Sequence, residues 1–471
     1  MENEKANLPI PEKKSEVVKE TKKIQPFQTS KGMRDIFPED APAWFRARES
    51  AADIGDMYGF GYIETPILEN SDLFTRGVGM GTDIVEKEMY VLKTKGGDSL
   101  ALRPEFTAPV MRSFIENGMS RLPQPVKLWY FGPNFRHENP QSGRYRQFYQ
   151  TGFEIIGGES DPSYDAQIIV ACVRLLEKMK IKDPLIEINS IGCRACRNNY
   201  RKKLNDFYRR ELASGKKKAV CRDCERRLDT NILRLLDCKN PECEELKSRA
   251  PSVLDSLCTP CRTHFREVLE FLDEIGLSYS LNPYLVRGLD YYNRTVFEIF
   301  VEEGENNLAL GGGGRYDYLA EMIGGRSTPA VGAAMGIDRI INLLKERDQD
   351  FEPKKKDKVF VAHVGDMAKR KAFKLVEELL KGGVKVGEAL GKDSLQAQLK
   401  VADREGSPFS LIIGQKEVYE ESVIIRDMKT GAQENVPVSK IVDEVKKRLH
   451  KNQLTKIKKQ SGRAAFCLME N

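Results

Sequence analysis

The chain has 471 residues, of which 40% are hydrophobic and 31% are charged, and its formal net charge is +6. This length is sufficient for about three domains, each with its own hydrophobic core. No run of about 18 or more apolar residues occurs and the N-terminus lacks the apolar segment of a signal peptide, so we expect a cytoplasmic protein without a membrane span.

Residues 1–30 are rich in Lys, Glu and Pro and show little apolar periodicity, which predicts a disordered leader. Apolar spacing predicts a helix over residues 41–59, followed by a strand over residues 62–68 that Pro66 interrupts. Further strands are predicted at residues 89–92, 99–102, 126–131, 147–156, 185–188, 278–281, 295–300 and 308–311. Their spacing with hairpins predicts an antiparallel sheet, on which helices such as 166–179 would pack.

A cysteine-rich segment, residues 190–265, interrupts this sheet. Eight of the ten cysteines of the chain lie in it, as the pairs Cys193/Cys196, Cys221/Cys224, Cys238/Cys243 and Cys258/Cys261. In a reducing cytosol such pairs indicate metal binding before disulfides, and two pairs together can hold Zn²⁺ in a closed structural site. We therefore expect a separate lobe with structural zinc.

The charge of the chain is concentrated in the same segment. Between Cys193 and Arg262 there are eighteen Lys or Arg against ten Asp or Glu. A basic island on a nearly neutral protein fits a contact with the phosphates of a nucleic acid, and the alternative is a solvated face of charged helices.

The C-terminal part has a different pattern. Residues 346–357 are charged and contain Pro353, which indicates a linker. Residues 358–450 alternate short apolar strands with helical stretches, which predicts a compact α/β domain. Residues 451–471 form a basic tail that we expect to be disordered. The fold class predicted for the whole chain is thus multidomain, α/β and α+β.

An arginine-rich hairpin carries the strongest chemical signal. Two strands flank a Pro-Gln-Ser-Gly turn, and Arg136, Arg144 and Arg146 would lie near a common surface. The planar guanidinium pairs bidentately with phosphate oxygens, so the hairpin suits a polyphosphate. The alternative from charge alone is a salt-bridged surface hairpin.

The segment from Phe135 to Glu154 resembles motif 2 of class II aminoacyl-tRNA synthetases, in the form found in histidyl-tRNA synthetases. A second block, Leu285-Val-Arg-Gly-Leu-Asp-Tyr-Tyr-Asn-Arg-Thr-Val-Phe-Glu298, resembles the histidine-holding signature of that family. The segments 103–107, 312–317 and 331–339 follow in the family's order. The resemblance covers about residues 32–449.

The resemblance implies a domain plan and a reaction. Residues 31–345 would form the class II antiparallel-sheet catalytic domain, interrupted by the 190–265 lobe, and residues 358–450 the anticodon-binding domain. Residues 41–68 resemble motif 1, which implies a homodimer. The implied activity is that of a histidine-tRNA ligase, which uses ATP with Mg²⁺, L-histidine and tRNA-His.

The implied ATP contacts come mainly from arginines. Arg136 would bind the α-phosphate, and Arg144 and Arg339 would reach the outer phosphates, while Glu138 contacts the adenosine side or a metal. Arg287 would bridge the histidine carboxylate and the α-phosphate, which makes Arg287, Arg136 and Arg339 the expected catalytic residues. The alternative for Arg339 is a buried ion pair.

The implied histidine pocket is polar, because the neutral imidazole ring carries one donor and one acceptor. Glu154 and Tyr292 would satisfy the ring, and Glu105, Thr107 and Gln150 would hold the α-ammonium and carboxylate groups. The full expected set adds Phe106, Tyr291, Arg136 and Arg287. Two positions depart from the family: Asn139 stands where arginine is usual, and Phe106 where glycine is frequent.

Two rival functions remain. A regulatory paralogue subunit of ATP phosphoribosyltransferase would bind histidine without charging tRNA, but such paralogues lack the anticodon domain and often the ATP-binding arginines. A structural zinc-ribbon RNA-binding protein would explain only the insertion. For the cysteines, four pairs can be joined in three ways. Because an insertion leaves and rejoins its sheet at nearby points, we predict that Cys193, Cys196, Cys258 and Cys261 form one zinc site and Cys221, Cys224, Cys238 and Cys243 the other.

Overall fold

The computed structural model describes residues 26–141, 143–213, 220–303, 306–347 and 358–452. The chain folds as two compact units, Met1–Phe351 and Glu352–Asn471. Most of the expected leader, linker and basic tail lies outside the described residues. In the part of the chain that is described, no helix has the length and apolar character needed to cross a membrane.

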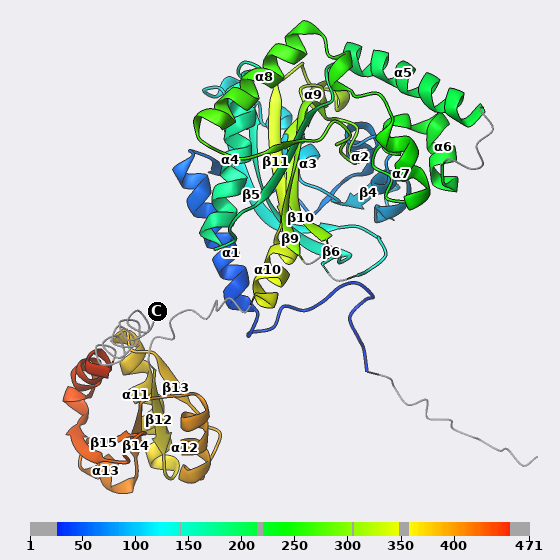
Figure 1. Ribbon diagram of the computed structural model, residues 1–471. Coiled ribbons are helices and arrows are strands. Elements are labelled where there is room, and N and C mark those ends of the chain that lie inside the picture. The colour runs from blue at the N-terminus through cyan, green and yellow to red at the C-terminus, as the bar shows by residue number, and fades with distance from the viewer. Residues whose placement is uncertain (1–25, 142, 214–219, 304–305, 348–357, 453–471) are drawn as a thin grey trace, which may run out of the picture. The chain divides into compact units, whose positions relative to one another are not determined.

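The first unit is built on an eight-stranded sheet (Figure 1) with the order β1-β5-β6-β11-β10-β9-β7-β8. The strands are β1 Gly61–Tyr62, β5 Val126–Phe135, β6 Gln147–Ile156, β7 Leu185–Ser190, β8 Ser280–Leu281, β9 Asn293–Glu303, β10 Asn306–Arg315 and β11 Ala330–Gly336. The six central strands, from β5 to β7 in this order, run antiparallel to one another, as predicted, whereas the edge pairs β1/β5 and β7/β8 are parallel.

The strands expected at residues 89–92 and 99–102 do not belong to this sheet; they form part of a separate three-stranded sheet, as Val91–Lys93 and Ser99–Leu102. Two further predictions were wrong in detail. The single strand expected over residues 62–68 is divided into β1 and the separate strand β2, Leu68–Asn70, since Pro66 cannot donate to a ladder. The strand β11 was not predicted, because its Ala-Val-Gly-Ala-Ala-Met-Gly sequence has little of the β-branched and aromatic character typical of strands.

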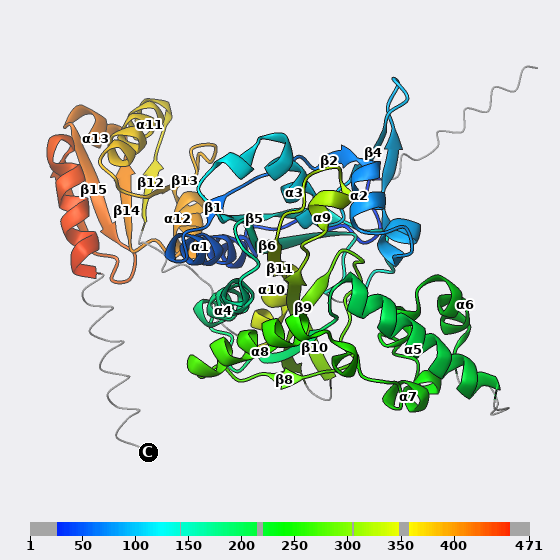
Figure 2. The ribbon, with the colours of Figure 1, turned by 90° about the horizontal axis from the view of Figure 1, so that it is seen from above.

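Helices cover one face of the sheet with a continuous apolar core. They are α1 Ala41–Met57, α4 Pro162–Lys178, α8 Thr259–Glu274 and α10 Ile337–Glu346 (Figure 2). α4 begins where Asp161 accepts a hydrogen bond from the Ser163 N–H and Pro162 occupies the first turn, a favoured arrangement for a helix start. Strand residues such as Phe153 and Ile155 point to these helices, so the intervening Glu154 faces the opposite side.

That opposite side carries the smaller elements. They are α2 Ser71–Gly77, α3 Thr107–Glu116, α9 Leu319–Met322, the short η1 Ile84–Glu88 and η2 Met119–Arg121, and a three-stranded sheet of β2, β3 Val91–Lys93 and β4 Ser99–Leu102. Their side chains pack with Leu128, Tyr130 and Val296 into a second core. This layer does not cover the sheet completely, and the candidate site lies in the uncovered part.

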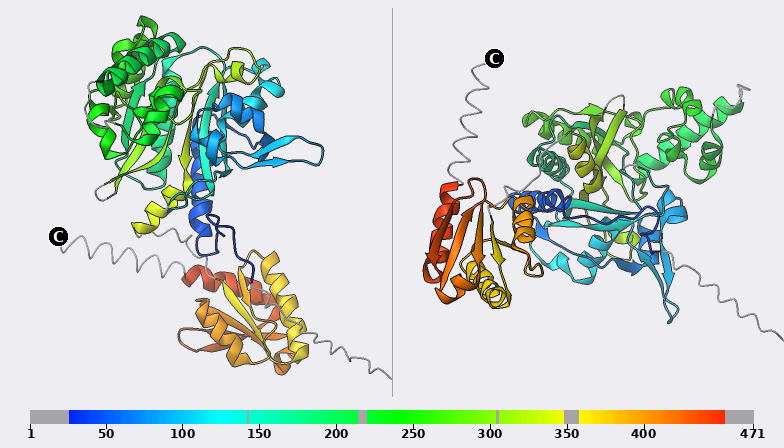
Figure 3. Two further views of the ribbon diagram at one scale, coloured as in Figure 1. Left: turned by 90° about the vertical axis from the view of Figure 1, so that its right-hand side faces the viewer. Right: turned by 90° about the horizontal axis from the view of Figure 1, so that it is seen from below.

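The insertion lobe, residues 190–265, is a group of helices beside the sheet (Figure 3). It contains α5 Arg194–Ala213, α6 Arg222–Thr230, η3 Ile232–Leu235, α7 Pro241–Ser248 and η4 Leu254–Ser256. The strands that bracket it, β7 and β8, are hydrogen-bonded neighbours. The lobe thus leaves and rejoins the sheet at adjacent points, as expected, although α8 continues through its expected end at residue 265.

The second unit has a five-stranded mixed sheet with the order β13-β12-β14-β15-β16. Its elements are β12 Val359–His363, α11 Asp366–Lys381, β13 Val386–Glu388, α12 Leu395–Arg404, β14 Phe409–Ile413, α13 Gln415–Tyr419, β15 Ser422–Asp427, β16 Gln433–Pro437, η5 Val438–Lys440 and a helix over residues 441–452. It has its own apolar core. The predicted α/β character is confirmed; β16 and α13 were not predicted.

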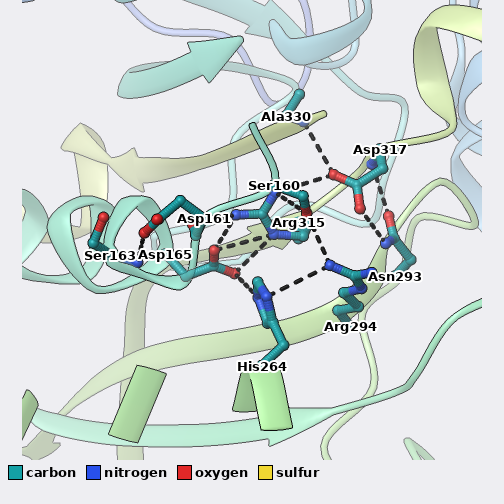
Figure 4. Close-up of polar contacts among 10 residues, drawn as sticks. All are labelled: Ser160, Asp161, Ser163, Asp165, His264, Asn293, Arg294, Arg315, Asp317 and Ala330. Atoms are coloured by element: carbon teal, nitrogen blue, oxygen red, sulfur yellow. Dashed lines mark hydrogen bonds and ion pairs between the residues drawn. The ribbon is translucent and has the colours of Figure 1, made fainter. Parts of the chain in front are cut away.

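A buried ion pair joins the helix layer of the first unit to the sheet (Figure 4). The Arg315 guanidinium, 1% exposed, is hydrogen-bonded to Asp165, which is fully buried, and also contacts Asp317 at 3.1 Å. Burial alone would raise the pKa of Asp165, but the charge of Arg315 lowers it to about 2. The pair fixes α4 against the end of β10.

We predict that Asp165→Asn lowers the free energy of unfolding by about 3 kcal/mol or more, because it leaves a buried guanidinium short of its main counter-charge. Glu177→Gln is the control: it breaks the exposed Arg174–Glu177 pair on the same helix and should cost less than about 1 kcal/mol. Urea unfolding followed by tryptophan fluorescence measures both, since Trp44 and Trp129 lie in the first unit. Equal losses in the two variants would contradict the assigned role.

Candidate active site

A pocket of about 780 Å³ opens on the sheet face opposite α4 and α8. Eleven of the twelve expected histidine and ATP residues line it: Glu105, Phe106, Thr107, Arg136, Glu138, Arg144, Gln150, Arg287, Tyr291, Tyr292 and Arg339. The twelfth, Glu154, is fully buried beneath it. Residues from position 105 to position 339 of the sequence therefore meet at one cavity.

The hairpin of β5 and β6 supplies the first cationic groups. Arg136 donates from Nε to the Pro104 carbonyl at 2.9 Å, and its guanidinium lies 5.2 Å from the centre of the Phe148 ring. Arg144 is 43% exposed and its Nη1 is 3.8 Å from the Glu138 carboxylate. Arg136 is therefore fixed through its Nε, whereas the side chain of Arg144 makes only one long ionic contact and can turn toward a ligand.

Arg287 approaches the pocket from the other side. Its Nη1 donates to Glu298 at 2.7 Å, and its buried Nε has no hydrogen-bond partner among the described residues. Burial alone would lower the pKa of Arg287, but the Glu298 carboxylate raises it. A Cβ at position 312 would lie 2.9 Å from Arg287 Nη1, so Gly312 provides the space for this side chain. A charged group with an unused donor is suited to bind an anion.

Arg339, at the start of α10, completes the expected set of four guanidinium groups, and Arg234 of the insertion lobe lines the pocket as a fifth. Its Nη1 donates to the Ala309 carbonyl at 2.7 Å and its Nε to the Gly143 carbonyl at 3.4 Å. These hydrogen bonds go to main-chain carbonyls, so the alternative of a buried ion pair is not what the structure shows. Burial and then the positive charge of Arg144 lower the pKa of Arg339. Arginines gathered in this way require a strongly negative ligand, such as a polyphosphate.

Glu154 lies at the floor of the other end of the pocket. Thr107 Oγ1 donates to it at 2.9 Å, the Tyr130 hydroxyl at 3.3 Å, and the Tyr316 hydroxyl is also hydrogen-bonded to it. A Cβ at position 332 would lie 1.5 Å from a Glu154 oxygen, so only glycine fits on the neighbouring strand. Burial raises the pKa of Glu154 to about 8, although these hydrogen bonds oppose the shift.

The wall beside Glu154 is formed by the start of α3. Both carboxylate oxygens of Glu105 accept main-chain N–H groups of Thr107 and Ala108, at 2.7 and 2.9 Å, so Glu105 caps this helix while it lines the pocket. Burial raises the pKa of Glu105. Phe106 stacks on the Tyr130 ring, with centroids 4.1 Å apart, and so forms an apolar wall.

Gln150 lies across the pocket on β6. Its Oε1 accepts a hydrogen bond from Asn134 at 2.6 Å, which leaves the amide nitrogen of Gln150 available to a ligand. The Tyr291 hydroxyl is 3.4 Å from Glu105. Glu105, Thr107, Glu154 and Tyr291 are thus linked by short polar contacts at this end of the pocket.

Several pocket residues were missed by the sequence analysis. Tyr130 lines the pocket and contacts Glu154, and its place on the same face of β5 as Leu128 could have been read from the strand alternation. Glu298 holds Arg287. Arg234 and Lys239 come from the insertion lobe, and no local signal in the sequence predicts that they reach the pocket.

The cysteines come together in the two groups that were expected. The base cysteine group is Cys193, Cys196, Cys258 and Cys261, the outer cysteine group is Cys221, Cys224, Cys238 and Cys243, and within each group the Sγ atoms all lie within 4.8 Å of one another. The Sγ atoms of Cys193 and Cys196 are 3.6 Å apart and those of Cys221 and Cys238 are 3.8 Å apart. A tetrahedron with Zn–S bonds of about 2.3 Å has an edge of about 3.8 Å, so both groups fit Zn²⁺.

Comparison with known proteins gives two family matches. Residues 32–340 match the family described as histidyl-tRNA synthetase, and residues 358–448 match the family described as anticodon binding domain. The two matches coincide with the two compact units.

Individual relatives agree with these families. The chain is 44% identical over 423 residues to a histidine–tRNA ligase of Dehalococcoides mccartyi, which covers 90% of the chain and 100% of the relative. It is 46% identical over 407 residues to a histidine–tRNA ligase of Thermosipho melanesiensis, which covers 86% and 95%. The crystal structure of apo histidyl-tRNA synthetase of S. aureus superposes with a TM-score of 0.73 at 33% identity, and the match covers 89% of the chain and 99% of that structure.

We predict that Glu154→Gln becomes more stable relative to the unmodified protein as pH rises. Between the ordinary pKa of 4.5 and the folded value of about 8, the folded protein keeps a proton that the unfolded chain releases. Stability therefore falls with rising pH in this window for glutamate and not for glutamine. The difference in unfolding free energy should grow by about 3 kcal/mol between pH 5 and pH 8, measured by urea unfolding. A difference that does not change with pH would show that the carboxyl is already ionised.

Proposed function

The chain belongs to the histidyl-tRNA synthetase family, and we propose that it joins histidine to tRNA-His in the pocket described above, through the residues assigned below. The observation that carries this proposal is the arrangement of four arginines and a buried carboxyl around one cavity. Within a family of aminoacyl-tRNA ligases, such a cavity suits ATP at one end and histidine at the other. The reaction first forms histidyl-adenylate and pyrophosphate, and then transfers the histidyl group to the 3′ end of the tRNA.

In the first step the arginines counter negative charge. Arg136 binds the α-phosphate and Arg144 and Arg339 bind the outer phosphates, which agrees with the loose hold on Arg144. Glu138 contacts the adenosine side or the metal. ATP is used as its Mg²⁺ complex, in which the metal withdraws charge from the phosphate oxygens.

Arg287 acts at the point where the new bond forms. A histidine carboxylate oxygen attacks the α-phosphorus and the bond to the pyrophosphate oxygen breaks, so negative charge on the phosphate increases in the transition state. The Arg287 guanidinium, whose side chain is 18% exposed, can donate to that phosphate or to the attacking carboxylate. The Glu298 contact holds the guanidinium in place for this task.

The histidine ring is placed at the Glu154 end of the pocket. Glu154 and Tyr292 form hydrogen bonds with the ring nitrogens. Thr107 and Tyr130, which line the cavity, donate hydrogen bonds to Glu154 and hold its carboxyl group in place. Glu105, Thr107 and Gln150 hold the α-ammonium and carboxylate, and Phe106 and Tyr291 shape the walls. Apolar amino acids of similar size would leave these groups unpaired, which provides selectivity.

The second unit supports the ligase over the regulatory alternative. A regulatory paralogue would lack an anticodon-binding domain, whereas residues 358–448 match one. We assign residues 358–450 to binding the tRNA anticodon and residues 31–345 to catalysis. The cytoplasm is the proposed location, because translation takes place there.

We also propose a homodimer. Apolar side chains are exposed along the motif 1 region and the adjacent small sheet: Phe45 67%, Met57 72%, Ile67 43%, Leu68 46% and Val91 51%. Large exposed apolar groups in one region are typical of a protein interface.

For the cysteine groups we propose one structural Zn²⁺ each. Zinc would tie together helices that have only a small core of their own. The main-chain N–H of Cys258 donates to Cys196 Sγ at 3.0 Å, and that of Cys221 donates to Cys243 Sγ at 3.1 Å, as expected around thiolate ligands.

The proposed reaction is tested by ATP–pyrophosphate exchange with each amino acid in turn. We predict exchange that depends on histidine, and a fall in its kcat of about 100-fold or more for Arg287→Ala, with a smaller effect on histidine binding. Arg326→Ala, an exposed arginine of the same unit, is the control and should leave the rate unchanged. Exchange driven by another amino acid would refute the assignment, and equal losses of rate and binding would reduce Arg287 to a binding role.

For the metal, elemental analysis of protein purified under reducing conditions should find about two zinc ions per chain. Chelation of the metal should lower the unfolding temperature, because the lobe depends on the metal for much of its stability. Folded, active protein that contains no zinc would refute the proposed zinc sites.

A further inference from the structure

The loop of residues 282–292, which carries Arg287, Tyr291 and Tyr292, contains neither helix nor strand. Within the loop the Leu285 N–H donates to the Asn282 carbonyl, whereas other carbonyl groups of the loop accept from outside it, as that of Leu285 does from Asn189 of β7. Three of the donors to this loop are side chains of the insertion lobe. Arg197 bonds to the carbonyls of Asp290 and Tyr292, Arg234 to the carbonyl of Gly288, and Asn231 to the Asp290 side chain.

Arg197 has the most favourable geometry of the three. Its Nη1 is 2.7 Å from the Tyr292 carbonyl oxygen and 3.2 Å from that of Asp290. The two bonds enclose Tyr291, so they fix the part of the loop that presents both tyrosines to the pocket. Charged donors bind carbonyls more strongly than neutral ones.

Arg197 also follows Cys196 directly on α5, and Cys196 belongs to the base cysteine group. The chain beside it is tied to the end of the loop, because Arg294 N–H donates to the Gly192 carbonyl at 2.9 Å and Ile191 N–H donates to the Arg294 carbonyl at 2.8 Å. Arg294 has a φ of 50°, an unfavourable value for a residue with a side chain, so its backbone is held there by its surroundings.

A second connection runs through α8, which begins with the other two cysteines of the base group. His264, on the first turns of α8, lies 3.5 Å from both Asp165 and the Arg294 guanidinium, and Arg294 donates to Ser160 at 2.8 Å (Figure 4). The base cysteine group is thus connected to Arg294, just beyond the end of the loop, in two ways: through residues 191–192 and through His264 of α8.

We propose that Arg197 is a positioning residue for histidine recognition, through which the base cysteine group sets the geometry of Tyr291 and Tyr292. The lobe then does more than contact tRNA, since it completes the amino-acid pocket. The inference rests on the proposed function, because it assigns those tyrosines to histidine. The proposal goes further than the proposed function, because it makes the affinity for histidine depend on the metal that the base cysteine group would bind.

The first test measures equilibrium histidine binding and the exchange kinetics of Arg197→Ala. Its dissociation constant for histidine, and the KM for histidine, should rise about tenfold or more, while the KM for ATP stays within about twofold. Arg197→Lys should recover most of the binding, because both hydrogen bonds come from one nitrogen, which an ammonium can replace. Arg201→Ala, an exposed arginine one helical turn away, should bind histidine normally.

The zinc content of Arg197→Ala should equal that of the unmodified protein, so that weaker binding cannot be attributed to metal loss. Unchanged histidine binding in Arg197→Ala, or equal increases in both KM values, would overturn the proposal. Absence of histidine-dependent exchange in the unmodified protein would instead refute the proposed function itself.

The second test is a double-mutant cycle with Cys258→Ser. Serine is a good helix N-cap, so α8 keeps its start, while one zinc ligand is removed. Cys258→Ser should lose about one zinc ion per chain and weaken histidine binding, and the double variant with Arg197→Ala should bind little worse than either single variant, because both act through the same link. Additive losses, or normal histidine binding by Cys258→Ser, would overturn the link to the cysteine group.

Discussion

The shape of the candidate pocket depends on how the main-chain carbonyls of residues 282–292 are satisfied. This segment crosses the pocket without a strand partner, yet it must hold Arg287 and Tyr292 in fixed positions. Side chains from the insertion lobe supply donors to three of these carbonyls, those of Gly288, Asp290 and Tyr292. The basic charge of the lobe suggests a surface for nucleic acid, yet the lobe is also part of the wall of this pocket.

The opposite wall depends on a buried carboxyl. Glu154 projects from the central strand β6 into space that Gly332 leaves open, and three hydroxyl groups converge on it. These hydroxyls come from α3, from β5 and from the loop after β10, so three separate segments hold the carboxyl in place. The Glu154 side of the pocket is therefore part of the sheet, whereas the side formed by residues 282–292 is held in place by charged side chains of the insertion lobe.

Much of this arrangement could be predicted from the sequence, for different physical reasons. The strands of the hairpin and the first strands of the sheet follow from apolar patterning, and the pairing of the cysteines follows from the requirement that an inserted segment begins and ends at neighbouring strands. β11 was missed because small residues, needed where neighbouring strands and Glu154 approach closely, give no strand signal. Arg197 could not be found, because its partners are carbonyl groups nearly a hundred residues away and its own neighbours indicate only a metal site.

The central claim is that this pocket forms histidyl-adenylate and that the whole chain delivers the product to tRNA. It is tested most directly by incubating the purified full-length protein with ATP, Mg²⁺, labelled histidine and tRNA-His, and measuring label on the 3′ end of the tRNA. We expect label with histidine alone among the amino acids, and only on this tRNA. Tight histidine binding without transfer of label to tRNA would contradict the ligase assignment and favour a regulatory protein that binds histidine without charging tRNA.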